Sequence, residues 1–559
     1  MGIGRQLAAS AAAFLLVATA TSALAQQQTA PVDPGRIDSR LRERPDLPTV
    51  SPVEVPLLPR QQDAPESALR VVLTEVRFEG AVSVPMAVLE GLAAPYLNRE
   101  IPLAAVFQLA EEVTAEYRRR GMVLSRAVVG PQRIEDGVVT IQILEGYIDK
   151  VGIEGNAGGY RPYLERYLAP VTASRPTDGA ALSRALLLTR DLKGLDVRSV
   201  VTPSPTLAAA ADLSLVVERR PFEAYVAVDN RGTRWLGPVQ VYGGAIFNDG
   251  LGLGERISAT VVAAPEDNEL GFVALSYEQP LGGSGLRMNA FGSYARTRPG
   301  DELRALGLEG ESTTLGAGLD YPILRSRAMN VFVRSVFTAR DSNSANDLID
   351  PLFDDKIRTL SAEFLGNYAD VSGGFTSGRV ALTQGLNVFG ATEDGDADKS
   401  RATGSAQFTR FNIELSHTRP LVQEVMVQVA VAAQVSTHSL LASEEFGLGG
   451  SSYGRGFDNS ELTGDDGLAG KVELFRTFRG AGLASIEPYV FYEAGAVRQI
   501  DPLPGEARRD SLGSAGVGVR VALNDVVAGS LEFAQPFERD VASRGDRDGR
   551  VFFTLSAAF

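Results

Sequence analysis

Residues 425–432 read VMVQVAVA, a stretch in which every second residue is valine. Side chains of a β-strand point alternately to its two faces, so this stretch predicts a strand with one apolar face. The same alternation occurs at residues 224–229 and 517–524, and it recurs from Pro221 to the end of the chain. Such strands, about ten residues long, are typical of a membrane β-barrel, whose outer face meets lipid and whose inner face lines a polar lumen.

The length of this region sets the number of strands. Residues 220–559 provide room for roughly 16 strands that span a membrane, together with their connections. A closed barrel would also leave no unpaired strand edge in the lipid. We expect long external loops at Asp341–Lys356, Thr392–Arg401 and Gly447–Gly470. A soluble β-sandwich is the alternative fold with similar patterning.

The end of the chain continues the pattern. One face of the last predicted strand carries Val551, Phe553, Leu555, Ala557 and Phe559. A terminal aromatic residue on an alternating strand resembles the signal by which outer-membrane barrels are recognised for assembly. We therefore expect the barrel-assembly machinery to be a partner during biogenesis, and outer-membrane lipid to surround the barrel.

The first residues predict export. Arg5 is followed by an apolar run, residues 7–24, which ends in the small-x-small sequence ALA at 23–25. These features predict a cleavable signal peptide over residues 1–25, and a membrane anchor is the alternative. Residues 26–70 are rich in proline and predict a linker, within which Pro34–Arg44 could form a short charged helix.

Two small modules of mixed α and β structure are expected between the linker and the barrel, at residues 71–146 and 147–219. The sequence of each module predicts the order strand, helix, helix, strand, strand. This shared order indicates two copies of one module. In the first module the predicted elements are a strand around Val76 and Phe78, helices at Met86–Leu97 and from Pro102 to Gly121, and strands at Val123–Val129 and Val138–Glu145. In the second they are Ile148–Ile153, Arg161–Leu168, Gly179–Leu192, Val197–Val201 and Leu213–Glu218.

The composition argues against several classes of function. The chain has no cysteine and 2 histidines, His417 and His438, so most familiar catalytic and metal sites are not available to it. A formal net charge of -15 argues against nucleic-acid binding, which requires a basic face. No segment resembles a phosphate-binding loop, so we expect no nucleotide. We predict that the protein is not an enzyme and uses no catalytic residue, metal or cofactor.

A glycine-dense stretch, Gly447–Gly470, interrupts the series of predicted strands and contains GRGF at 454–457. This much glycine allows a loop to fold back on itself. An arginine turned inward would need a carboxylate, and Glu493 lies downstream in FYEAG, residues 491–495, which reads as a strand. The alternative is that Arg455 is a solvated loop cation.

These features resemble the outer-membrane transporters of two-partner secretion, the haemolysin secretion and activation type, over nearly the full length of the chain. YRRRG at 117–121, PQ at 131–132, Gly137 and EG at 145–146 resemble the signature of that family's first POTRA domain. Two further stretches resemble barrel strands of that family: YP at 321–322 with RSR at 325–327, and Tyr277 with PLG at 280–282.

The most specific motif of the family is an arginine-glycine-aromatic tip on a loop that folds into the barrel, where the arginine pairs with the acid of an F-x-D-x-G strand. Here the resemblance assigns the tip to Gly454, Arg455, Gly456 and Phe457, and the acid to Glu493. Two positions differ from the family pattern. Gly454 stands where a branched apolar residue is usual, and Glu493 where aspartate is usual, although the longer acid can still receive a guanidinium.

The resemblance implies a transporter that binds an unfolded exoprotein in the periplasm and moves it through the barrel to the cell surface. It also suggests that residues 34–44 plug the lumen. An unfolded chain can add to an exposed strand edge by main-chain hydrogen bonds. We expect cargo to dock on Val123, Leu124, Arg126 and Val128, beside the helix around residues 106–117; alternatively, this edge packs against its neighbour.

Three other functions remain possible for such a chain. A barrel-assembly or lipid-export relative would share the inward loop, although such proteins usually carry more soluble modules. A passive porin would share the barrel but would not explain the modules. A barrel enzyme, such as an esterase or a protease, would need a nucleophile with a nearby base.

Overall fold

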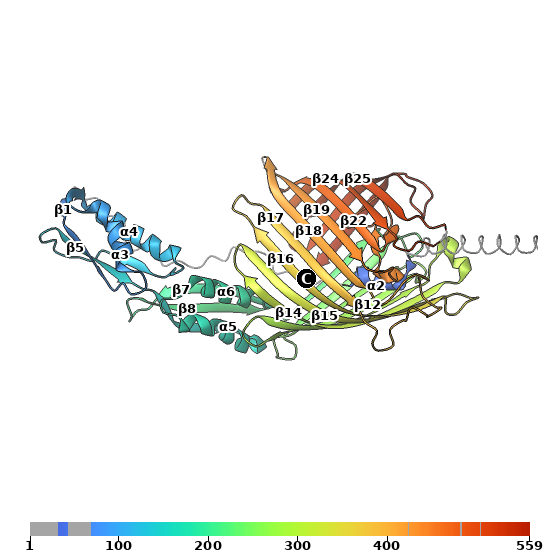
Figure 1. Cartoon of the computed structure of the whole chain (residues 1–559), viewed down its shortest axis with the longest axis horizontal. Helices are drawn as coiled ribbons and strands as arrows, with labels where there is room; N and C mark the ends of the chain where they lie inside the picture. The colour runs from blue at the N-terminus through green and yellow to red at the C-terminus, as the bar shows by residue number, and fades with distance from the viewer. Residues whose placement is uncertain (1–31, 43–68, 423, 481–482, 504) are drawn as a thin grey trace, which may run out of the picture.

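The computed structural model describes residues 32–42, 69–422, 424–480, 483–503 and 505–559. The predicted signal peptide and most of the predicted linker lie outside these residues. Figure 1 shows two small modules of helices and strands, one after the other, followed by a large barrel. Among the described residues, no helix combines the length and the apolar character needed to cross a bilayer.

The barrel is closed and antiparallel. It runs from β9 (Phe222–Asp229) to β27 (Arg550–Ala558), which pair with each other to complete the ring. β22 (Asp466–Arg476) and β23 (Phe478–Gly480) both pair with β24 (Leu483–Arg498) and form two parts of one strand, so the described residues make 16 strands. The predicted barrel is therefore confirmed. The other strands are β10 (Gln240–Asn248), β11 (Arg256–Ala263), β12 (Leu270–Leu281), β13 (Leu286–Thr297), β14 (Glu309–Arg325), β15 (Met329–Ala345), β16 (Phe353–Ala369), β17 (Phe375–Gly385), β18 (Thr409–Val422), β19 (Val425–Ser436), β25 (Arg509–Ala522) and β26 (Val527–Phe537).

The alternation of residue types decides which side of each strand faces outward. In β19, Val429 and Val431 are exposed on the outer wall, whereas Ala430 and Ala432 are buried on the lumen side. In the last strand, Val551, Phe553 and Leu555 are exposed outward. This apolar outer wall is what a lipid environment requires.

One predicted external loop is wrong. Asp341–Lys356 is largely strand, because β15 and β16 stay paired beyond Asp341 opposite Lys356, as far as Ser344 opposite Phe353, and their connection is limited to residues 346–352. The polar residues of these projecting strands read as a loop in the sequence, although they pair with one another. Residues 392–401 do lie in a connection, between β17 and β18.

The first module has the predicted order of elements with two short additional strands, β1 (Arg70–Leu73) and β3 (Arg99–Pro102), which pair with each other. Its main sheet has the order β2-β5-β4, with β2 and β5 parallel. The remaining elements are β2 (Glu75–Glu79), α3 (Met86–Ala93), η2 (Ala94–Tyr96), α4 (Leu103–Arg119), β4 (Arg126–Val128) and β5 (Val138–Leu144). The apolar face of α4, including Val106, Leu109 and Val113, is buried in the core of the module.

The second module repeats this topology. Its sheet has the order β6-β8-β7, with β6 and β8 parallel. Its elements are β6 (Tyr147–Gly155), η3 (Gly158–Tyr160), α5 (Arg161–Ala173), α6 (Gly179–Arg190), β7 (Leu195–Pro203) and β8 (Ala210–Arg219). Two consecutive modules of one topology confirm the predicted fold class.

The EG motif at residues 145–146 has a structural explanation. The Glu145 carboxylate accepts hydrogen bonds from the amides of Val82 (2.9 Å) and Ser83 (2.6 Å) and from the Tyr117 hydroxyl (3.0 Å), and so connects α4 to the start of α3. Burial raises the pKa of Glu145, but these hydrogen bonds outweigh it and bring the pKa below its usual value. A Cβ on Gly146 would lie 2.2 Å from the backbone oxygen of Leu124, so only glycine fits there.

The second module is fastened to the short-turn end of the barrel, as Figure 1 shows. The Arg325 guanidinium, at the end of β14 in the RSR motif, donates to both carboxylate oxygens of Asp191 at 2.9 and 2.8 Å. The amide of Gly159 donates to Asp249 in the β10–β11 turn at 3.0 Å. Bidentate arginine–carboxylate pairs fix orientation as well as distance.

Candidate functional site: an inward loop and a lumen helix

The connection between β19 and β22, residues 437–465, folds into the barrel. It contains the one-turn helix η5 (Ala442–Glu444) and a small hairpin of β20 (Phe446–Leu448) and β21 (Leu462–Gly464). The predicted loop, Gly447–Gly470, extends too far at its end, because Gly467 and Gly470 belong to β22. Phe457 at the tip is 2% exposed and packs with apolar residues of the loop and the inner wall: Leu448, Leu462, Ala469, Val497, Leu512 and Val541.

Arg455 lies on the inner wall against three carboxylates. Its Nε is 3.3 Å from Glu493 Oε2 on β24, and its Nη1 is 3.1 Å from Glu473 on β22 and 3.0 Å from Glu532 on β26. The arginine is 5% exposed and the three glutamates are 0–3% exposed. The structure therefore brings Arg455 and Glu493 together and adds two acids that the sequence did not single out.

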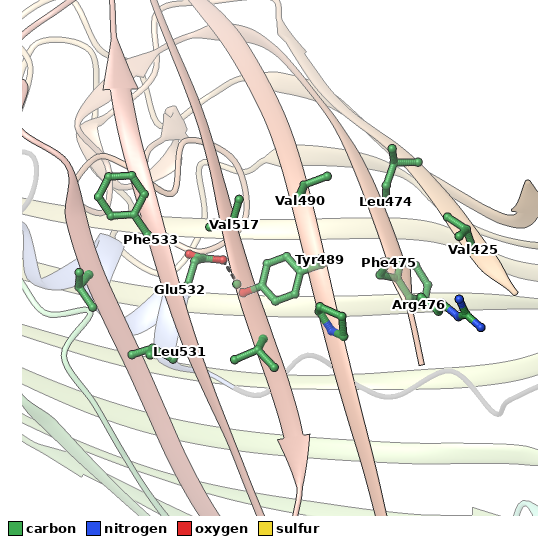
Figure 2. Close-up of a pocket in the computed structure, with 14 residues that line it drawn as sticks. Val425, Leu474, Phe475, Arg476, Tyr489, Val490, Val517, Leu531, Glu532 and Phe533 are labelled. Atoms are coloured by element: carbon green, nitrogen blue, oxygen red, sulfur yellow. Dashed lines mark hydrogen bonds between the residues drawn. The ribbon is translucent and has the colours of Figure 1, made fainter. Parts of the chain in front are cut away.

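Other side chains complete this group. Arg520 approaches Glu473 within 2.5 Å and Arg231 approaches Glu532 within 2.9 Å, so three arginines face three glutamates. The Tyr489 hydroxyl donates a hydrogen bond of 2.8 Å to Glu532, and Figure 2 shows the two side chains directed at each other. A buried charge is tolerated when it is paired and hydrogen-bonded. Each charge of this group is paired, and among the described residues only one buried polar atom of the group, Nη2 of Arg455, has no hydrogen-bond partner.

Two aromatic rings lie close to the Arg455 guanidinium. The Arg455 Cζ lies 3.5 Å from the centroid of the Phe491 ring and 5.9 Å from that of Tyr489. These short contacts add a cation–π attraction to the ion pairs. Phe491 belongs to the FYEAG stretch, so that stretch supplies both the acid and the ring.

Glu493 also holds the backbone of the loop tip. Its Oε1 accepts hydrogen bonds from the amide of Gly454 at 2.9 Å, from the amide of Arg455 and from the Ser514 hydroxyl at 2.8 Å. One oxygen therefore binds the main chain while the other binds the guanidinium. The carboxylate therefore holds the loop tip in position and also balances the charge of Arg455.

The two glycines of the tip are required by space and by conformation. Gly454 has a φ of 93°, in the left-handed region that favours glycine, and a Cβ there would lie 2.8 Å from Leu512 Cδ1. A Cβ on Gly456 would lie 2.9 Å from the backbone nitrogen of Pro536 on β26. The difference at Gly454 from the family pattern is thus accommodated by a local backbone turn.

A sequence signal for the two missed acids does exist. Glu473 stands between Val472 and Leu474, and Glu532 between Leu531 and Phe533. A charged residue between outward-facing apolar neighbours on a barrel strand must point into the lumen. The acids could have been placed inside the barrel, but not opposite Arg455, because strand pairing over such sequence distances is not visible in the sequence.

The helix α2 (Pro34–Leu41) lies inside the barrel (Figure 1). Asp33 caps its first turn by accepting the Arg36 amide at 2.8 Å. Asp38 is 0% exposed; it accepts a hydrogen bond from Ser293 on β13 and another from Thr314 on β14, the latter at 2.7 Å. Both strand residues face the lumen, so α2 is held against the inner wall.

α2 also binds the inward loop. The Arg36 guanidinium donates to the backbone oxygens of Ala442 (2.6 Å) and Glu445 (3.3 Å) and to the Ser460 hydroxyl (3.2 Å). These three partners all lie between β19 and β22. The helix and the loop therefore form one connected body inside the lumen.

The expected docking residues are only partly at a strand edge. β4 is limited to Arg126–Val128, and it is an edge strand in the order β2-β5-β4. The predicted strand at Val123 and Leu124 is wrong, because both residues lie in a turn. Leu124 is 3% exposed and belongs to the core of the second module, against which Val123 also packs. The need to cover the neighbouring module prevails over the strand propensity of these residues.

Within the described residues, no group of three or more histidine, cysteine, aspartate or glutamate side chains could hold a metal ion. The inward loop and α2 lie in the lumen and are held there by ion pairs and hydrogen bonds.

Comparisons with known proteins place the chain in a family. The model of the haemolysin secretion/activation protein ShlB/FhaC/HecB matches residues 212–521, and the ShlB-type POTRA domain model matches residues 71–146. The heme/hemopexin transporter protein HuxB of Haemophilus influenzae is 22% identical over 451 residues, covering 80% of each chain. The outer membrane transporter CdiB of Escherichia coli is 25% identical over 508 residues, covering 89% of this chain and 82% of CdiB.

The structure of CdiB from Escherichia coli has the same fold, with a TM-score of 0.69 at 19% sequence identity, and covers 97% of this chain and 98% of its own. The first family model alone spans more than half of the 559 residues. The chain belongs to the haemolysin secretion/activation family of ShlB, FhaC and HecB.

Proposed function

We propose that the protein is an outer-membrane transporter that binds an unfolded partner exoprotein in the periplasm and translocates it through the barrel to the cell surface. One observation carries this proposal: α2 and the inward loop together occupy the lumen of a closed barrel. A passive porin has no use for an obstruction of this kind. A conduit for a polypeptide must be wide enough for the chain and must be closed when no chain is present.

The two modules lie on the periplasmic side, since the second one is fastened to the short-turn end of the barrel. In outer-membrane barrels the short turns face the periplasm and the long loops face outward. The modules are thus placed where an exported, still unfolded chain arrives. Outer-membrane lipid surrounds the apolar wall, and the barrel-assembly machinery inserts the barrel.

We propose that cargo docks at β4, beside α4. One amide of this edge is already satisfied, because the Ala127 N–H donates to the Thr114 hydroxyl on α4 at 2.9 Å. Arg126 and Val128 flank it and are half-buried. An added strand would therefore pair with part of the edge and would contact α4 with its side chains.

Transport needs no nucleotide in this proposal. Vectorial movement comes from binding at the modules and from folding of the exoprotein once it is outside. The inward loop and α2 must leave the path of the chain, and the ion pairs at Arg455 give the loop a defined position to which it returns.

The adjacent reading frame is the natural place to find the exoprotein. The test is to express that exoprotein with and without this transporter and to measure it in the medium. We expect secretion only when the transporter is present. A barrel-assembly or lipid-export relative would instead change the amounts of other outer-membrane proteins or of lipid, so both are measured in the same cells.

A further inference from the structure

Two arginines lie on the outer wall of the barrel, where apolar side chains are expected. Arg419 on β18 lies opposite Val427 of β19. Arg476 on β22 lies opposite Val425 of the same strand. Both valines belong to the outward-facing row of β19, so the two arginines also face the lipid. A charge on this face is costly in the middle of the bilayer but is tolerated near its surface.

An outward-facing aromatic residue marks the depth of these arginines. Tyr368 on β16 is 47% exposed and lies opposite Thr376 of β17. Thr376 in turn lies opposite His417 of β18, two residues before Arg419. Tyrosines gather at the membrane–water interface. Arg419, which is closer to the short turn, therefore lies at the level of the lipid headgroups on the periplasmic side.

Neither guanidinium is held by a strong partner. Arg419 is exposed and has no hydrogen bond or ion pair among the described residues. Arg476 donates to Glu424 at 2.7 Å, but the Glu424 side chain is 74% exposed, and exposed ion pairs contribute little. The Arg476 Cζ also lies 4.7 Å from the centroid of the Phe478 ring. Both cations can therefore accept an anion from outside the chain.

The two arginines are close enough to share one anion. Only β19 separates β18 from β22 in the barrel, and Arg476 is shifted along the register by two residues from the row of Arg419. Strands about 4.8 Å apart and a rise of about 3.4 Å per residue place the two Cα atoms about 12 Å apart. Two long side chains can approach one phosphate from opposite sides over this distance.

An apolar groove of about 630 Å³ begins at Arg476 and crosses the outer wall. Figure 2 shows Arg476 and Val425 at one end of the groove and Phe533 at the other. Between them it is lined by outward-facing residues of four strands: Leu474 on β22, Val490 on β24, Val517 on β25 and Leu531 on β26. An acyl chain in this groove would contact more apolar surface than it would on a flat wall.

We propose that Arg419, Arg476 and this groove form a binding site for one phospholipid of the periplasmic leaflet whose headgroup has a net negative charge. The two guanidinium groups bind the phosphate, and an acyl chain lies in the groove. Guanidinium groups match phosphate oxygens in charge and in geometry. A zwitterionic headgroup also carries a cation, which two arginines repel. The site does not depend on what the barrel transports.

The lipid site lies behind the ion pairs of the inward loop. Leu474 follows Glu473 on β22, and Leu531 precedes Glu532 on β26. Neighbouring residues of a strand point to opposite faces. A lipid in the groove therefore contacts the same strand segments whose inner faces hold Arg455. Because the site exists only in the folded barrel, the bound lipid stabilises this part of the wall.

A single fluorophore at the site provides the test. The full-length protein with Trp235→Phe and Phe478→Trp has its only tryptophan beside Arg476. In mixed bilayers of phosphatidylglycerol and phosphatidylcholine, bromine atoms on the chains of one lipid quench a tryptophan that this lipid contacts. Exchanging the brominated lipid gives the preference of the site. We expect phosphatidylglycerol to be preferred about tenfold or more, since one arginine near a membrane surface contributes about fivefold.

Variants made in this reporter protein test the two arginines. Arg419→Gln with Arg476→Gln should abolish the preference. Arg419→Gln alone, which breaks no ion pair of the described residues, should reduce it about fivefold. The matched control is Arg327→Gln with Arg479→Gln, which removes two exposed arginines from the same end of the barrel and should keep the preference. Arg327 lies in the β14–β15 turn, and Arg479 points to the other face of β23 from that of position 478.

Two further variants test the place of the site. Tyr321→Trp with Trp235→Phe moves the fluorophore to the outer wall of β14, away from the groove, and should show no such preference. Val490→Phe in the first reporter protein fills the groove and keeps both arginines. It should reduce the preference at least about twofold, because the acyl chain loses its contacts.

Equal quenching by the two lipids at position 478 would overturn the inference, as would a preference that survives the loss of both arginines. An unchanged preference in Val490→Phe would mean that the groove takes no part. Inorganic phosphate should not displace the lipid, and displacement would show a site for free phosphate instead. None of these results depends on secretion of the exoprotein, so failure of the lipid site leaves the proposed function as it stands.

Discussion

Arg455→Ala removes the cation that faces three carboxylates at the loop tip. The side-chain nitrogens lie 3.0–3.3 Å from Glu532, Glu473 and Glu493, and all four groups are nearly inaccessible to solvent. Removing one partner of a buried pair typically costs about 3–5 kcal/mol, because it leaves the other charge uncompensated. Such a change alters the ratio of inward to displaced loop by a factor of roughly one hundred to several thousand.

We therefore expect Arg455→Ala to raise the conductance of single channels in planar lipid bilayers and to reduce secretion of the exoprotein. The amount of folded barrel in the outer membrane should not change. The displacement itself can be measured with Ser514→Cys, because Ser514 is 0% exposed beneath the tip and the chain has no other cysteine. A water-soluble maleimide should label this cysteine faster when Arg455 is absent.

Arg508→Ala is the matched control, since Arg508 is an exposed arginine in the neighbouring external connection. Arg455→Lys should give an intermediate effect, because lysine keeps the charge but not the planar fork. Arg455→Ala combined with Glu493→Ala should be no worse than the first change alone, since one uncompensated acid is removed with the cation. Wild-type conductance and labelling in Arg455→Ala would refute the reasoning.

Glu493→Gln should raise conductance less than Glu493→Ala, because the amide oxygen can still accept the backbone N–H groups of the tip; equal effects in bilayer recordings would mean that only the charge matters. Ile37→Asn should increase the open fraction of single channels by loosening α2, and an unchanged open fraction would exclude the helix as an obstruction. Val128→Pro should reduce secretion with the barrel intact, whereas Val200→Pro, on the exposed edge strand of the second module, should not; similar secretion by both variants would argue against docking at β4. The Glu145 pKa is lower in the folded module than its ordinary value of 4.5, so its contribution to stability is present above that pH and is lost as the pH falls. Hydrogen exchange of residues 71–146 in the full chain should show this loss, and Glu145→Gln should reduce it.

The parts of the fold that follow from local pattern could be predicted from the sequence. Alternation in stretches such as residues 425–432 determines which face of a strand meets lipid, and the repeated order of elements reveals the two modules. Features that depend on distant contacts could not be predicted. Leu124 reads as strand but is required in the core of the next module, and the strands around Asp341 and Lys356 read as loop because their polar residues are paired with each other.

The site residues divide in the same way, into those that a local motif predicts and those that depend on distant contacts. Arg455 and Glu493 could be singled out because each lies in a short motif. Glu473 and Glu532 lie on strands far apart in the sequence, and their convergence on Arg455 depends on the register of the barrel. The burial of Val262, Leu270, Phe272 and Ala295 on the inner face of β11, β12 and β13 could not be predicted, since they look like ordinary strand residues until distant residues such as Ile37 and Trp235 are packed with them.

The sharing of Arg455 among β22, β24 and β26 has an evolutionary consequence. A mutation that changes any one of the three acids alters the charge balance felt by the other two, so these positions are not free to drift one at a time. Among descendants of a common ancestor, we expect the three to be inherited as a set or lost as a set. A lineage in which Arg455 is replaced should also lose the three glutamates soon afterwards.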